Sequence, residues 1–502
     1  MSEFVMGVDI GTSSTKAVLF TEQGQVVNRC AISYQMKTDT RGKAELDPDQ
    51  IFEAVCGAIR GGMLESKVDK NEILAVSFSA AMHSLILIDE TGKPLTKCIT
   101  WADGRSSGAL KRMKQKFDLE ALYQKTGTPI HAMSPFAKLC WLQETEPEKV
   151  KLAMRICGIK SYVLYHFFGK WVIDASLASG SGLFNPVTMK WEPLALNLVN
   201  IPEGKLPEVV SESHQLTGLS ETSGERLLLN VDTPFVIGAN DGSLANLGIQ
   251  ALGESDVTVT VGTSGAVRKI GHSFLPDEHG RTFCYRLTDG YFVRGGAVNN
   301  GGKIVEWALE QLAPRAIRNE RDYEKLMEQA GEIPLGAEGL LFLPYLLGER
   351  APYWTDDIRG AFLGLSESHT RAHMVRAVVE GVTLNLYSVY QEIQAEGDVL
   401  YVTGGIARQE FWCQLLADVF GHEVRVPYTV EGSSLGAAII ALEAFGEIQG
   451  FKLDAEPEIT ARFFPDPKRH ERYLAWHAVF AEAAEALMAS NRRIIEWLNE
   501  DE

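Results

Sequence analysis

The stretch Asp9-Ile-Gly-Thr-Ser-Ser-Thr-Lys16 lies between two strands that the sequence predicts near the start of the chain. The first strand is Phe4–Ile10 and the second is Lys16–Phe20, and a third is expected from Gln25, so the chain opens as a β-meander. Glycine lets backbone N–H groups approach an anion, the hydroxyls can donate hydrogen bonds, and Lys16 adds a positive charge. The stretch therefore has the chemistry of a phosphate-binding turn. A plain hairpin whose Ser and Thr side chains satisfy the turn is the alternative.

The same pattern returns 251 positions later in the chain. The β-branched strand Asp256–Val261 ends in Gly262-Thr-Ser264, just as the first strand ends in Gly11-Thr-Ser13. A match of three residues is weak by itself, but the spacing equals the size expected of one domain, and each copy begins a half of the chain. Two such turns can hold the phosphate tail of ATP from opposite sides, which is the arrangement of the actin-like ATPases.

A third glycine turn fits this arrangement. Both the G-x-x-x-x-G-K-[ST] loop and the G-x-G-x-x-G fingerprint are absent from the sequence, so another means of binding a nucleotide is needed. Val402-Thr-Gly-Gly-Ile406 overlaps the end of the predicted strand Val399–Thr403 and precedes a predicted helix. Glycines without side chains let the base and ribose of a nucleotide lie against the backbone there. An ordinary turn at the start of a helix remains the alternative for Gly404-Gly405.

The composition excludes several classes of protein. The formal net charge is −18 and no basic cluster is present, which argues against a nucleic-acid partner. The seven cysteines are scattered and never spaced as C-x-x-C, so we expect reduced thiols, not a disulfide framework or a zinc site. A secretory leader and an apolar run of the roughly 20 residues that span a bilayer are both absent. A cytoplasmic protein is therefore expected.

The length of 502 residues predicts two domains, because one hydrophobic core seldom organises so long a chain. We place them at residues 1–250 and 251–450, followed by a C-terminal helical extension at 451–502. Asp47 is expected to cap a first helix with Pro48 at its first position, and Thr370 is expected to cap a long helix in the second half.

Several further motifs agree with a single family. They are Asp9–Lys16, Met82-His83, Trp101-Ala-Asp-Gly-Arg105, Gly238-Ala-Asn-Asp-Gly242, Gly262-Thr-Ser-Gly265, Gly348-Glu-Arg-Ala-Pro352 with Arg359-Gly360, and Gly404-Gly405. From residue 4 to about residue 445 the sequence resembles the FGGY carbohydrate kinases. The resemblance implies an α/β fold of two ribonuclease-H-like domains, the actin-like ATPase fold, around a central cleft. The sugar is then bound mainly by the first domain and the nucleotide mainly by the second.

By this resemblance Asp241 is the catalytic base that accepts the proton of the attacking sugar hydroxyl. A carboxylate of ordinary basicity suffices, because phosphoryl transfer passes through a loose transition state and the proton leaves late. The position also has a simpler interpretation. Asp241 follows the predicted strand Phe235–Gly238 and precedes the predicted helix Leu244–Ile249, which is the setting of a helix N-cap.

The resemblance implies a set of residues for each ligand. The sugar-binding residues are Met82, His83, Trp101, Asp103, Arg105 and Asn240. The nucleotide-binding residues are Gly11, Thr12, Ser13, Lys16, Gly262, Thr263, Gly302, Lys303, Gly404, Gly405 and Gln409. ATP and Mg²⁺ are the implied cofactors, with Asp9 and Asp241 holding the metal. A packed His or Trp, and a surface ion pair between Asp103 and Arg105, are the simpler interpretations of the sugar site.

Within the family, three segments resemble the gluconate kinases: Ser79–Ser84, Asn240–Asn246 and Val298–Gly302. Gly242 stands where the xylulokinases and glycerol kinases carry an amide residue after the catalytic aspartate. The expected reaction is ATP-dependent phosphorylation of D-gluconate to 6-phosphogluconate. Arg105 or His83 is the expected partner of the substrate carboxylate.

Three alternatives stay open at this point. The first is a xylulokinase or another pentulose or polyol kinase of the same family. The second is an actin-like ATPase of the chaperone or filament type, and the third is a sugar sensor that has lost catalysis. The expected partners are a small sugar or sugar acid and a second copy of the chain in a homodimer, with neither nucleic acid nor membrane.

Overall fold

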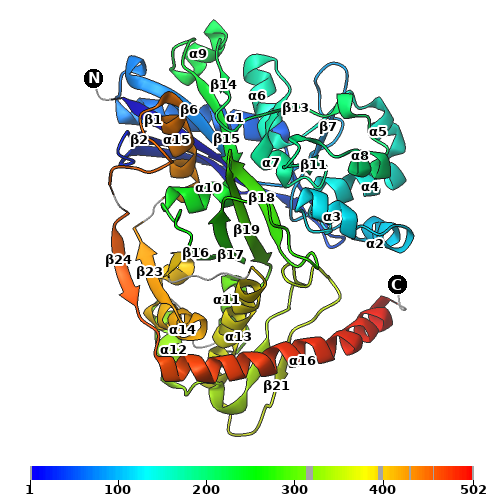
Figure 1. The fold of residues 1–502 in the computed structure, drawn as a ribbon, viewed down its shortest axis with the longest axis vertical. Coiled ribbons are helices and arrows are strands. Elements are labelled where there is room, and N and C mark those ends of the chain that lie inside the picture. Colours follow the sequence, from blue (N-terminus) through cyan, green and yellow to red (C-terminus); the bar gives the residue numbers. More distant parts are fainter. Residues whose placement is uncertain (1–2, 313–319, 394–398, 429–430, 456, 500–502) are drawn as a thin grey trace. The chain divides into compact units, whose positions relative to one another are not determined.

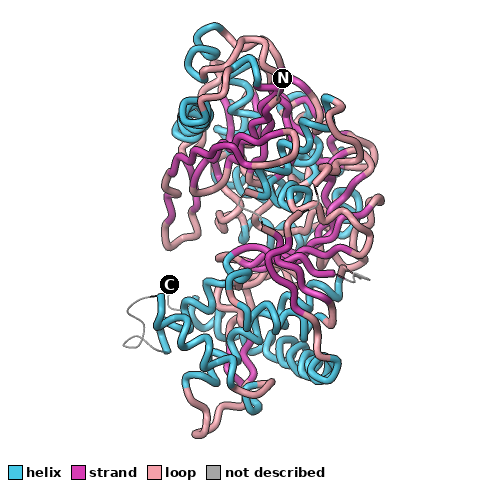
Figure 2. The backbone as a smooth tube through the Cα atoms, turned by 90° about the vertical axis from the view of Figure 1, so that its left-hand side faces the viewer, coloured by secondary structure: helices cyan, strands magenta, loops and turns pink. Residues whose placement is uncertain are grey.

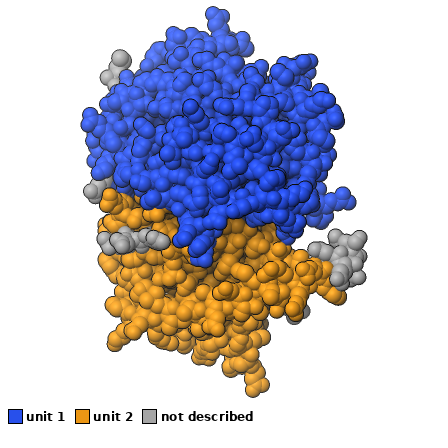
Figure 3. Space-filling model, turned by 45° about the vertical axis from the view of Figure 1, so that its right-hand side comes forward, with its two compact units in different colours: residues 1–252, 271–293, 429–457 blue, residues 253–270, 294–428, 458–502 orange. Residues whose placement is uncertain are grey.

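The computed structural model describes most of the chain (Figure 1). The described residues are 3–312, 320–393, 399–428, 431–455 and 457–499. They form two compact units, each assembled from three segments (Figure 3). Unit 1 contains residues 1–252, 271–293 and 429–457, and unit 2 contains residues 253–270, 294–428 and 458–502. Each unit is therefore built from segments that are distant in the sequence, and our division into domains at residues 250 and 450 stays a prediction.

Unit 1 is organised around a six-stranded sheet with the order β14-β15-β6-β1-β2-β3. Its strands are β1 Phe4–Ile10, β2 Ser14–Thr21, β3 Val26–Ser33, β6 Ile73–Ala80, β14 Gln215–Leu216 and β15 Phe235–Asn240. The first three strands pair antiparallel, which confirms the predicted meander, while β6 runs parallel to both β1 and β15. Parallel strands end at the same edge of a sheet, so β1, β6 and β15 bring their carboxyl ends together.

Several helices pack against this sheet, and three of them bear on the site. They are α1 Pro48–Ser66, α10 Asp241–Gly248 and α15 Gly432–Phe445. The side chain of Asp47 accepts a hydrogen bond from the Asp49 N–H, and Pro48 follows at the first position, as predicted. Helix α1 packs against β2 and β3, whereas α15 packs against β1, β6 and α10. The helix closest to the end of β15 is therefore supported by a segment near the end of the chain.

The chain between β6 and β14 forms smaller elements with a core of their own, to which Leu110, Leu139 and Phe184 contribute. Its helices are α2 Ser107–Lys116, α3 Glu120–Thr126, α4 Pro135–Thr145, α5 Pro147–Leu152, α6 Ile159–Phe168, α7 Ala175–Ser179 and α8 Pro193–Val199; α9 Glu221–Leu227 follows β14. Its short strands, with two from before β6, are β4 Lys37–Thr38, β5 Ala44–Leu46, β7 Ile86–Ile88, β8 Cys98–Ile99, β9 Arg155–Cys157, β10 Val172–Asp174, β11 Phe184–Asn185, β12 Lys190–Trp191 and β13 Glu208–Val210.

Unit 2 repeats the opening of unit 1. Strand β16 (Asp256–Val261) pairs antiparallel with β17 (Gly265–Gly271) and parallel with β22 (Val399–Gly404). Strand β23 (Glu423–Pro427) pairs with β22, and β24 (Ile459–Phe463) pairs with β23. Strand, glycine turn and strand therefore recur in both units, as the repeat in the sequence predicts.

The remaining elements complete the chain, and Figure 2 distinguishes its helices from its strands by colour. The strands are β18 Phe283–Thr288, β19 Tyr291–Val298, β20 Leu341–Leu343 and β21 Ala361–Leu363. The helices are α11 Gly302–Leu312, α12 Glu320–Glu332, α13 Arg371–Glu392, α14 Glu410–Phe420 and α16 Pro467–Asn499. Thr370 caps α13 in a capping box with His373, which confirms the predicted start of this helix. One face of α16 is buried through Tyr473, His477 and Phe480, so this helix contributes to the core of unit 2.

Candidate active site

The first predicted turn follows β1. Asp9 is the second-to-last residue of this strand. One of its carboxylate oxygens accepts a hydrogen bond of 2.7 Å from the Ser79 hydroxyl on β6. Burial raises the pKa of Asp9, while the Ser79 hydrogen bond and the charge of Lys16 oppose the shift. A carboxylate and a lysine thus face each other across β1 and β2, because Asp9 and Lys16 are partners in the strand register.

Backbone hydrogen bonds hold the turn itself. The Gly11 N–H donates to the carbonyl oxygen of Ser14 at 3.0 Å, and the Tyr34 hydroxyl donates to the carbonyl oxygen of Gly11 at 2.7 Å. Thr12 is half-buried and Ser13 is exposed. The turn is therefore fixed at its base, while its tip presents the residue types that a phosphate requires.

Lys16 has an acidic partner that the sequence analysis did not find. Its amine lies 2.9 Å from a carboxylate oxygen of Glu431, whose side chain is 9% exposed. The next residues form the start of α15, where the Ser433 hydroxyl donates to the carbonyl oxygen of Asp241 at 3.3 Å. No local pattern in the sequence indicates this contact, because 415 positions separate Lys16 from Glu431.

Asp241 is the first residue of α10, and it is half-buried. The helix is capped by Asn240 instead, whose side-chain oxygen accepts a hydrogen bond of 2.8 Å from the Ser243 N–H. The interpretation of Asp241 as the N-cap is therefore wrong. The Asn240 side chain is fully buried, and its amide nitrogen lies 2.7 Å from the Ser176 hydroxyl. The predicted sugar contact of Asn240 stays a prediction, and the cap is the role that the contacts show.

The Met82-His83 pair follows β6, and both residues are half-buried. His83 has a left-handed backbone with φ of 65°, and its Nδ1 lies 2.7 Å from the carbonyl oxygen of Gly180. The amine of Lys138 on α4 donates to the carbonyl oxygen of His83 at 2.5 Å and to that of Ile99 at 3.4 Å. Burial lowers the pKa of Lys138 to about 7. Lys138 therefore joins the two segments that carry Met82-His83 and Trp101, a role that no sequence pattern revealed.

Asp103 and Arg105 form a pair that is not on the surface. Asp103 is 2% exposed, and it accepts hydrogen bonds from the Ala44 N–H at 2.9 Å and from Arg105 Nη2 at 2.7 Å. Arg105 Nη2 also donates to Glu45 at 2.6 Å, and its guanidinium lies 4.5 Å from the ring centroid of Trp141. Burial opposes charging, but the hydrogen bonds to Asp103 and Glu45 outweigh it and raise the pKa of Arg105. The simpler interpretation as a surface ion pair is therefore wrong.

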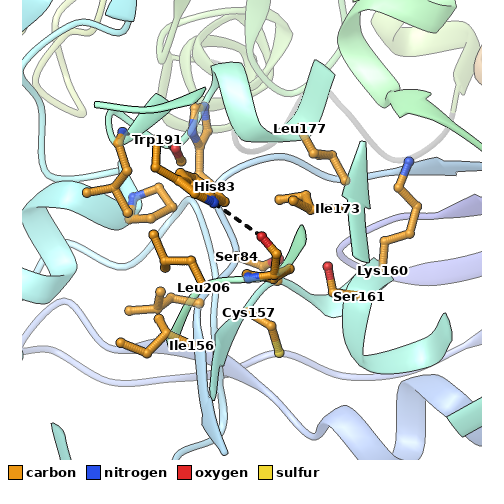
Figure 4. Close-up of a pocket in the computed structure, with 16 residues that line it drawn as sticks. His83, Ser84, Ile156, Cys157, Lys160, Ser161, Ile173, Leu177, Trp191 and Leu206 are labelled. Atoms are coloured by element: carbon orange, nitrogen blue, oxygen red, sulfur yellow. Dashed lines mark hydrogen bonds between the residues drawn. The ribbon is translucent and has the colours of Figure 1, made fainter. Parts of the chain in front are cut away.

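A small cavity of about 40 Å³ lies behind His83 (Figure 4). Its walls include His83 and Ser84 together with apolar side chains such as Ile156, Ile173 and Leu206. Such a volume holds about one water molecule. It is too small for a sugar, so it belongs to the packing beneath the Met82-His83 segment.

In unit 2, the second predicted turn lies beside the start of α11. The Gly262 N–H donates to the carbonyl oxygen of Ser264 at 2.9 Å, and both Gly262 and Thr263 are exposed. The N–H of Gly302 donates to the carbonyl oxygen of Gly262 at 2.7 Å, and the N–H of Lys303 donates to that of Thr263 at 3.3 Å. The structure thus brings together two segments that were predicted separately to bind the nucleotide.

The third glycine turn lies at the end of β22. Gly404 has φ of 89°, and a Cβ atom there would lie 2.4 Å from the carbonyl oxygen of Val261, so only glycine fits. Gly404 and Gly405 are exposed, and Gln409 stands at the N-cap of α14. Because β22 pairs in parallel with β16, this turn and the Gly262-Thr263 turn share one edge of the sheet.

Glu349, from the Gly348–Pro352 motif, contacts the segment that leads into α11. Its fully buried carboxylate accepts hydrogen bonds from the Asn299 N–H at 2.5 Å, from the Asn300 amide at 3.0 Å and from the Asn385 amide at 2.8 Å. Burial raises the pKa of Glu349, and these hydrogen bonds oppose the shift. Asn299 and Asn300 lead directly to Gly302, so Glu349 holds the segment that enters α11.

The residues that the structure describes contain no group of three or more His, Cys, Asp or Glu side chains arranged to hold a metal ion. No helix among them is long and apolar enough to cross a membrane. All seven cysteines are free thiols, and six of them are buried, as the sequence predicts.

Comparison with known proteins agrees with this geometry. The N-terminal domain of the FGGY family of carbohydrate kinases matches residues 4–248, and the C-terminal domain of that family matches residues 257–445. The chain is 42% identical over 460 residues to a gluconokinase of Bacillus subtilis (strain 168), covering 90% of this chain and 89% of that protein. A xylulose kinase of Staphylococcus epidermidis (strain ATCC 35984 / DSM 28319 / BCRC 17069 / CCUG 31568 / BM 3577 / RP62A) is 28% identical over 487 residues, covering 96% of each chain.

Two solved structures from Lactobacillus acidophilus share this fold, one described as a gluconate kinase and the other as a ligand-bound xylulose kinase. Each is 32% identical with a TM-score of 0.93, covering 98% of this chain and 100% of the solved chain. The predicted α/β fold of two ribonuclease-H-like domains is therefore confirmed. With both family domains matched over most of its length, the chain belongs to the FGGY family of carbohydrate kinases.

Proposed function

We propose that this kinase transfers the γ-phosphoryl group of ATP to the 6-hydroxyl of D-gluconate and forms 6-phosphogluconate. The observation that carries the proposal is the much higher identity to a gluconokinase than to a xylulose kinase over a similar share of the chain. The two solved structures do not separate these substrates, because both resemble the chain equally. The Ser79–Ser84, Asn240–Asn246 and Val298–Gly302 segments support gluconate as well.

Asp241 is the proposed base of the reaction. Its carboxylate stands at the first position of α10, where the helix dipole favours a negative charge. The hydroxyl oxygen of the sugar forms a bond to the γ-phosphorus as the bond to the ADP oxygen breaks, and the hydroxyl proton passes to Asp241. The cap supplied by Asn240 fixes the backbone on which Asp241 stands. The base is thereby oriented before the sugar arrives.

A magnesium site is also part of the proposal. Mg²⁺ prefers oxygen ligands and usually binds through one or two carboxylates while it keeps several water molecules. Asp9 lies near the end of β1, and Asp241 directly follows the end of β15. Both strands end at the same edge of the unit 1 sheet, so these two carboxylates fit this ion. When bound, Mg²⁺ neutralises charge on the ATP phosphates. Asp9 would hold the ion, and its Ser79 hydrogen bond would fix the carboxylate.

The carboxylate of gluconate needs a donor, because an unpaired buried carboxylate costs several kcal/mol. Arg105 already binds both Asp103 and Glu45, so a third carboxylate would meet a cation whose charge is balanced. This favours His83 over Arg105 as the partner. Replacing His83 by Gln should then raise KM for gluconate more than KM for glycerol, in an assay of both acceptors at saturating ATP.

An acceptor panel tests the substrate. ADP release is measured with D-gluconate, D-xylulose, D-ribulose and glycerol, and with D-glucitol, which replaces the gluconate carboxylate by a neutral CH₂OH group. Gluconate should exceed every other acceptor in kcat/KM, and glucitol should fall about 100-fold or more below it, since a polar site rejects analogues that leave its donors unpaired. A preference for xylulose would overturn gluconate and support the alternative substrate, while the kinase family would stand.

Two lesser proposals accompany the substrate. We place the enzyme in the cytoplasm, because free thiols persist in a reducing compartment. We also propose a homodimer, and light scattering during size-exclusion chromatography measures its mass. A mass of one chain, about 55 kDa, would overturn the homodimer.

A further inference from the structure

A buried lysine lies beside the strand that leads to Asp241. The Lys160 amine on α6 donates hydrogen bonds to the carbonyl oxygens of Ile237 at 2.9 Å and Ala239 at 3.1 Å. It also lies 2.7 Å from a carboxylate oxygen of Asp174, and the two side chains are 1% and 0% exposed. Lys160 is also one of the residues that line the small cavity near His83 (Figure 4). The amine is therefore held by the backbone of β15 and by its ion pair with Asp174.

The two carbonyl groups flank an irregularity in β15. Gly238 has φ of 67°, and the pairing of β15 with β6 shifts between Val236 and Ala239. A Cβ atom at Gly238 would lie 1.9 Å from the carbonyl oxygen of Phe78, so the strand can bend here only with glycine. A shifted strand turns carbonyl groups away from the regular ladder, and buried carbonyl groups need donors. Lys160 supplies donor hydrogens to two carbonyl groups within four residues of Asp241.

Asp174 connects this lysine to a second support. Its other carboxylate oxygen accepts a hydrogen bond of 2.7 Å from the Leu177 N–H and so caps α7. Helix α7 carries Ser176, whose hydroxyl oxygen lies 3.3 Å from the Asn240 backbone nitrogen and 2.7 Å from its amide nitrogen. Asn240 in turn caps the helix that begins at Asp241. The backbone before Asp241 is therefore held by Lys160 through carbonyl groups and by Ser176 through N–H groups.

Stability alone does not explain a buried ion pair at this place. Well-packed apolar side chains of similar volume often stabilise a protein as much as a buried ion pair does. Burial lowers the pKa of Lys160, and the charges of Asp174, Glu212 and Asp241 oppose the shift. The charge of Lys160 is therefore balanced mainly by Asp174, its ion-pair partner.

We propose that Lys160, Asp174 and Ser176 form a positioning unit that fixes Asp241 for proton transfer. This inference rests on the proposed role of Asp241 as the base. None of the three residues is assigned to contact the sugar or the nucleotide; they act on the reaction through the backbone of residues 237–240. Misplacing a reacting group by about 1 Å costs roughly 100-fold in rate, so the unit should affect kcat much more than KM.

The mildest variant is Ser176→Ala, and the chain offers a matched control in Ser179→Ala. Both serines are fully buried on α7, but the Ser179 hydroxyl donates to the carbonyl oxygen of Ser176 and accepts from the Arg286 N–H, and neither of these two hydrogen bonds involves β15. Ser176→Ala should lower kcat by roughly 10- to 100-fold at unchanged KM for gluconate and ATP. Ser179→Ala should keep kcat within about twofold of the parent enzyme.

Lys160→Met alone would leave Asp174 as an unpaired buried charge, and the protein could then fail to fold. The double variant Lys160→Met with Asp174→Asn avoids this, because Asn also caps a helix. We expect it to show native near-ultraviolet circular dichroism together with a kcat lowered by about 100-fold. If it is folded and retains the kcat of the parent enzyme, the positioning role of the ion pair is wrong.

A double-mutant cycle with Asp241→Asn separates positioning from general destabilisation. If Ser176 acts through Asp241, then Ser176→Ala should change the residual single-turnover rate of the Asp241→Asn enzyme by less than about twofold. A full 10-fold loss in that background would overturn the inference, and so would a Ser176→Ala enzyme that behaves like Ser179→Ala. If instead Asp241→Asn is nearly as active as the parent enzyme, it is the proposed base that fails.

Discussion

Lys16 and Glu431 form an ion pair, with 2.9 Å between the amine nitrogen and a carboxylate oxygen, although 415 positions separate them in the sequence. The Lys16 side chain is 40% exposed and that of Glu431 is 9% exposed, so the carboxylate is the fixed partner and the amine can still reach a ligand. A phosphate group that binds at the Gly11–Ser13 turn would compete with Glu431 for this amine. Glu431 therefore balances the positive charge that Lys16 brings to the first turn.

The exchange of Lys16 for Met should weaken nucleotide binding. We expect KM for ATP to rise about tenfold, which corresponds to about 1.4 kcal/mol, with KM for gluconate unchanged. Glu431→Gln should not raise KM for ATP, because it removes the carboxylate that is ion-paired with Lys16. Arg29→Met is the matched control, since Arg29 also lies near Glu431, at 3.7 Å, on the more exposed strand β3. An unchanged KM for ATP in the Lys16 variant would refute the role of this turn.

The repeat of the glycine turn predicts that both copies contact phosphate. Thr12→Val and Thr263→Val each remove one hydroxyl without much change in volume, so each should raise KM for ATP by several-fold, as expected for a lost hydrogen bond of about 1 kcal/mol. Steady-state kinetics at varied ATP and saturating gluconate measure the effect. If either variant leaves KM for ATP unchanged, the turn that carries it does not contact phosphate.

Asp241→Asn should remove most of the activity and leave the fold intact. Because Asn240 caps α10, the change at Asp241 leaves the capping hydrogen bond in place, and the free energy of unfolding should shift by less than about 0.5 kcal/mol. The loss of the general base should lower kcat at least about 100-fold. Asn240→Ala is the contrasting variant, which should cost about 1 kcal/mol of stability through the lost cap. Near-normal turnover by Asp241→Asn would remove it from the mechanism.

A buried histidine on α16 should make the enzyme less stable in mild acid. His477 is 7% exposed beside the Ser388 hydroxyl, and burial lowers its pKa to about 4. The unfolded chain, in which a histidine has a pKa near 6.5, binds the proton first as the pH falls. Stability is therefore full above about pH 6.5 and declines toward pH 4, by roughly 2 kcal/mol at pH 5.

Urea denaturation at pH 7 and pH 5 measures this difference. His477→Phe should remove about 2 kcal/mol of the acid-induced loss, whatever its effect at pH 7. His470→Gln is the control, because His470 lies on the same helix and is only partly buried. If the parent enzyme and His477→Phe lose the same free energy of unfolding between the two pH values, then His477 is not the source of the acid sensitivity.

Much of the fold follows from local patterns in the sequence. The strand Phe4–Ile10 has the predicted bounds in the structure, and Asp47 and Thr370 cap the helices that they were expected to cap. The repeat of the Gly-Thr-Ser turn correctly indicated a second copy of the same hairpin. These features are readable because a strand, a turn or a cap depends on residues within a few positions of each other.

The boundary between β15 and α10 was predicted less well. Asp241 and Asn240 are neighbours, and both residue types are good N-caps, so the sequence does not decide between them. The structure places Asn240 at the cap because β15 continues through it and its side chain meets the Ser243 N–H. The strand pairing with β6 thus determines which residue caps the helix and which is its first residue.

The sequence by itself determined the family, the two glycine turns and the residue types of the proposed site. The tertiary structure alone decided that Lys16 meets Glu431, that Arg105 meets Glu45 as well as Asp103, and that Lys160 meets Asp174. Lys16 and Glu431, and likewise Arg105 and Glu45, come from distant segments that only folding brings together, and a local pattern carries no record of them. Burial is the second reason why these pairs could not be predicted. Lysines are usually exposed, and the sequence alone does not show which lysine the folded chain will bury.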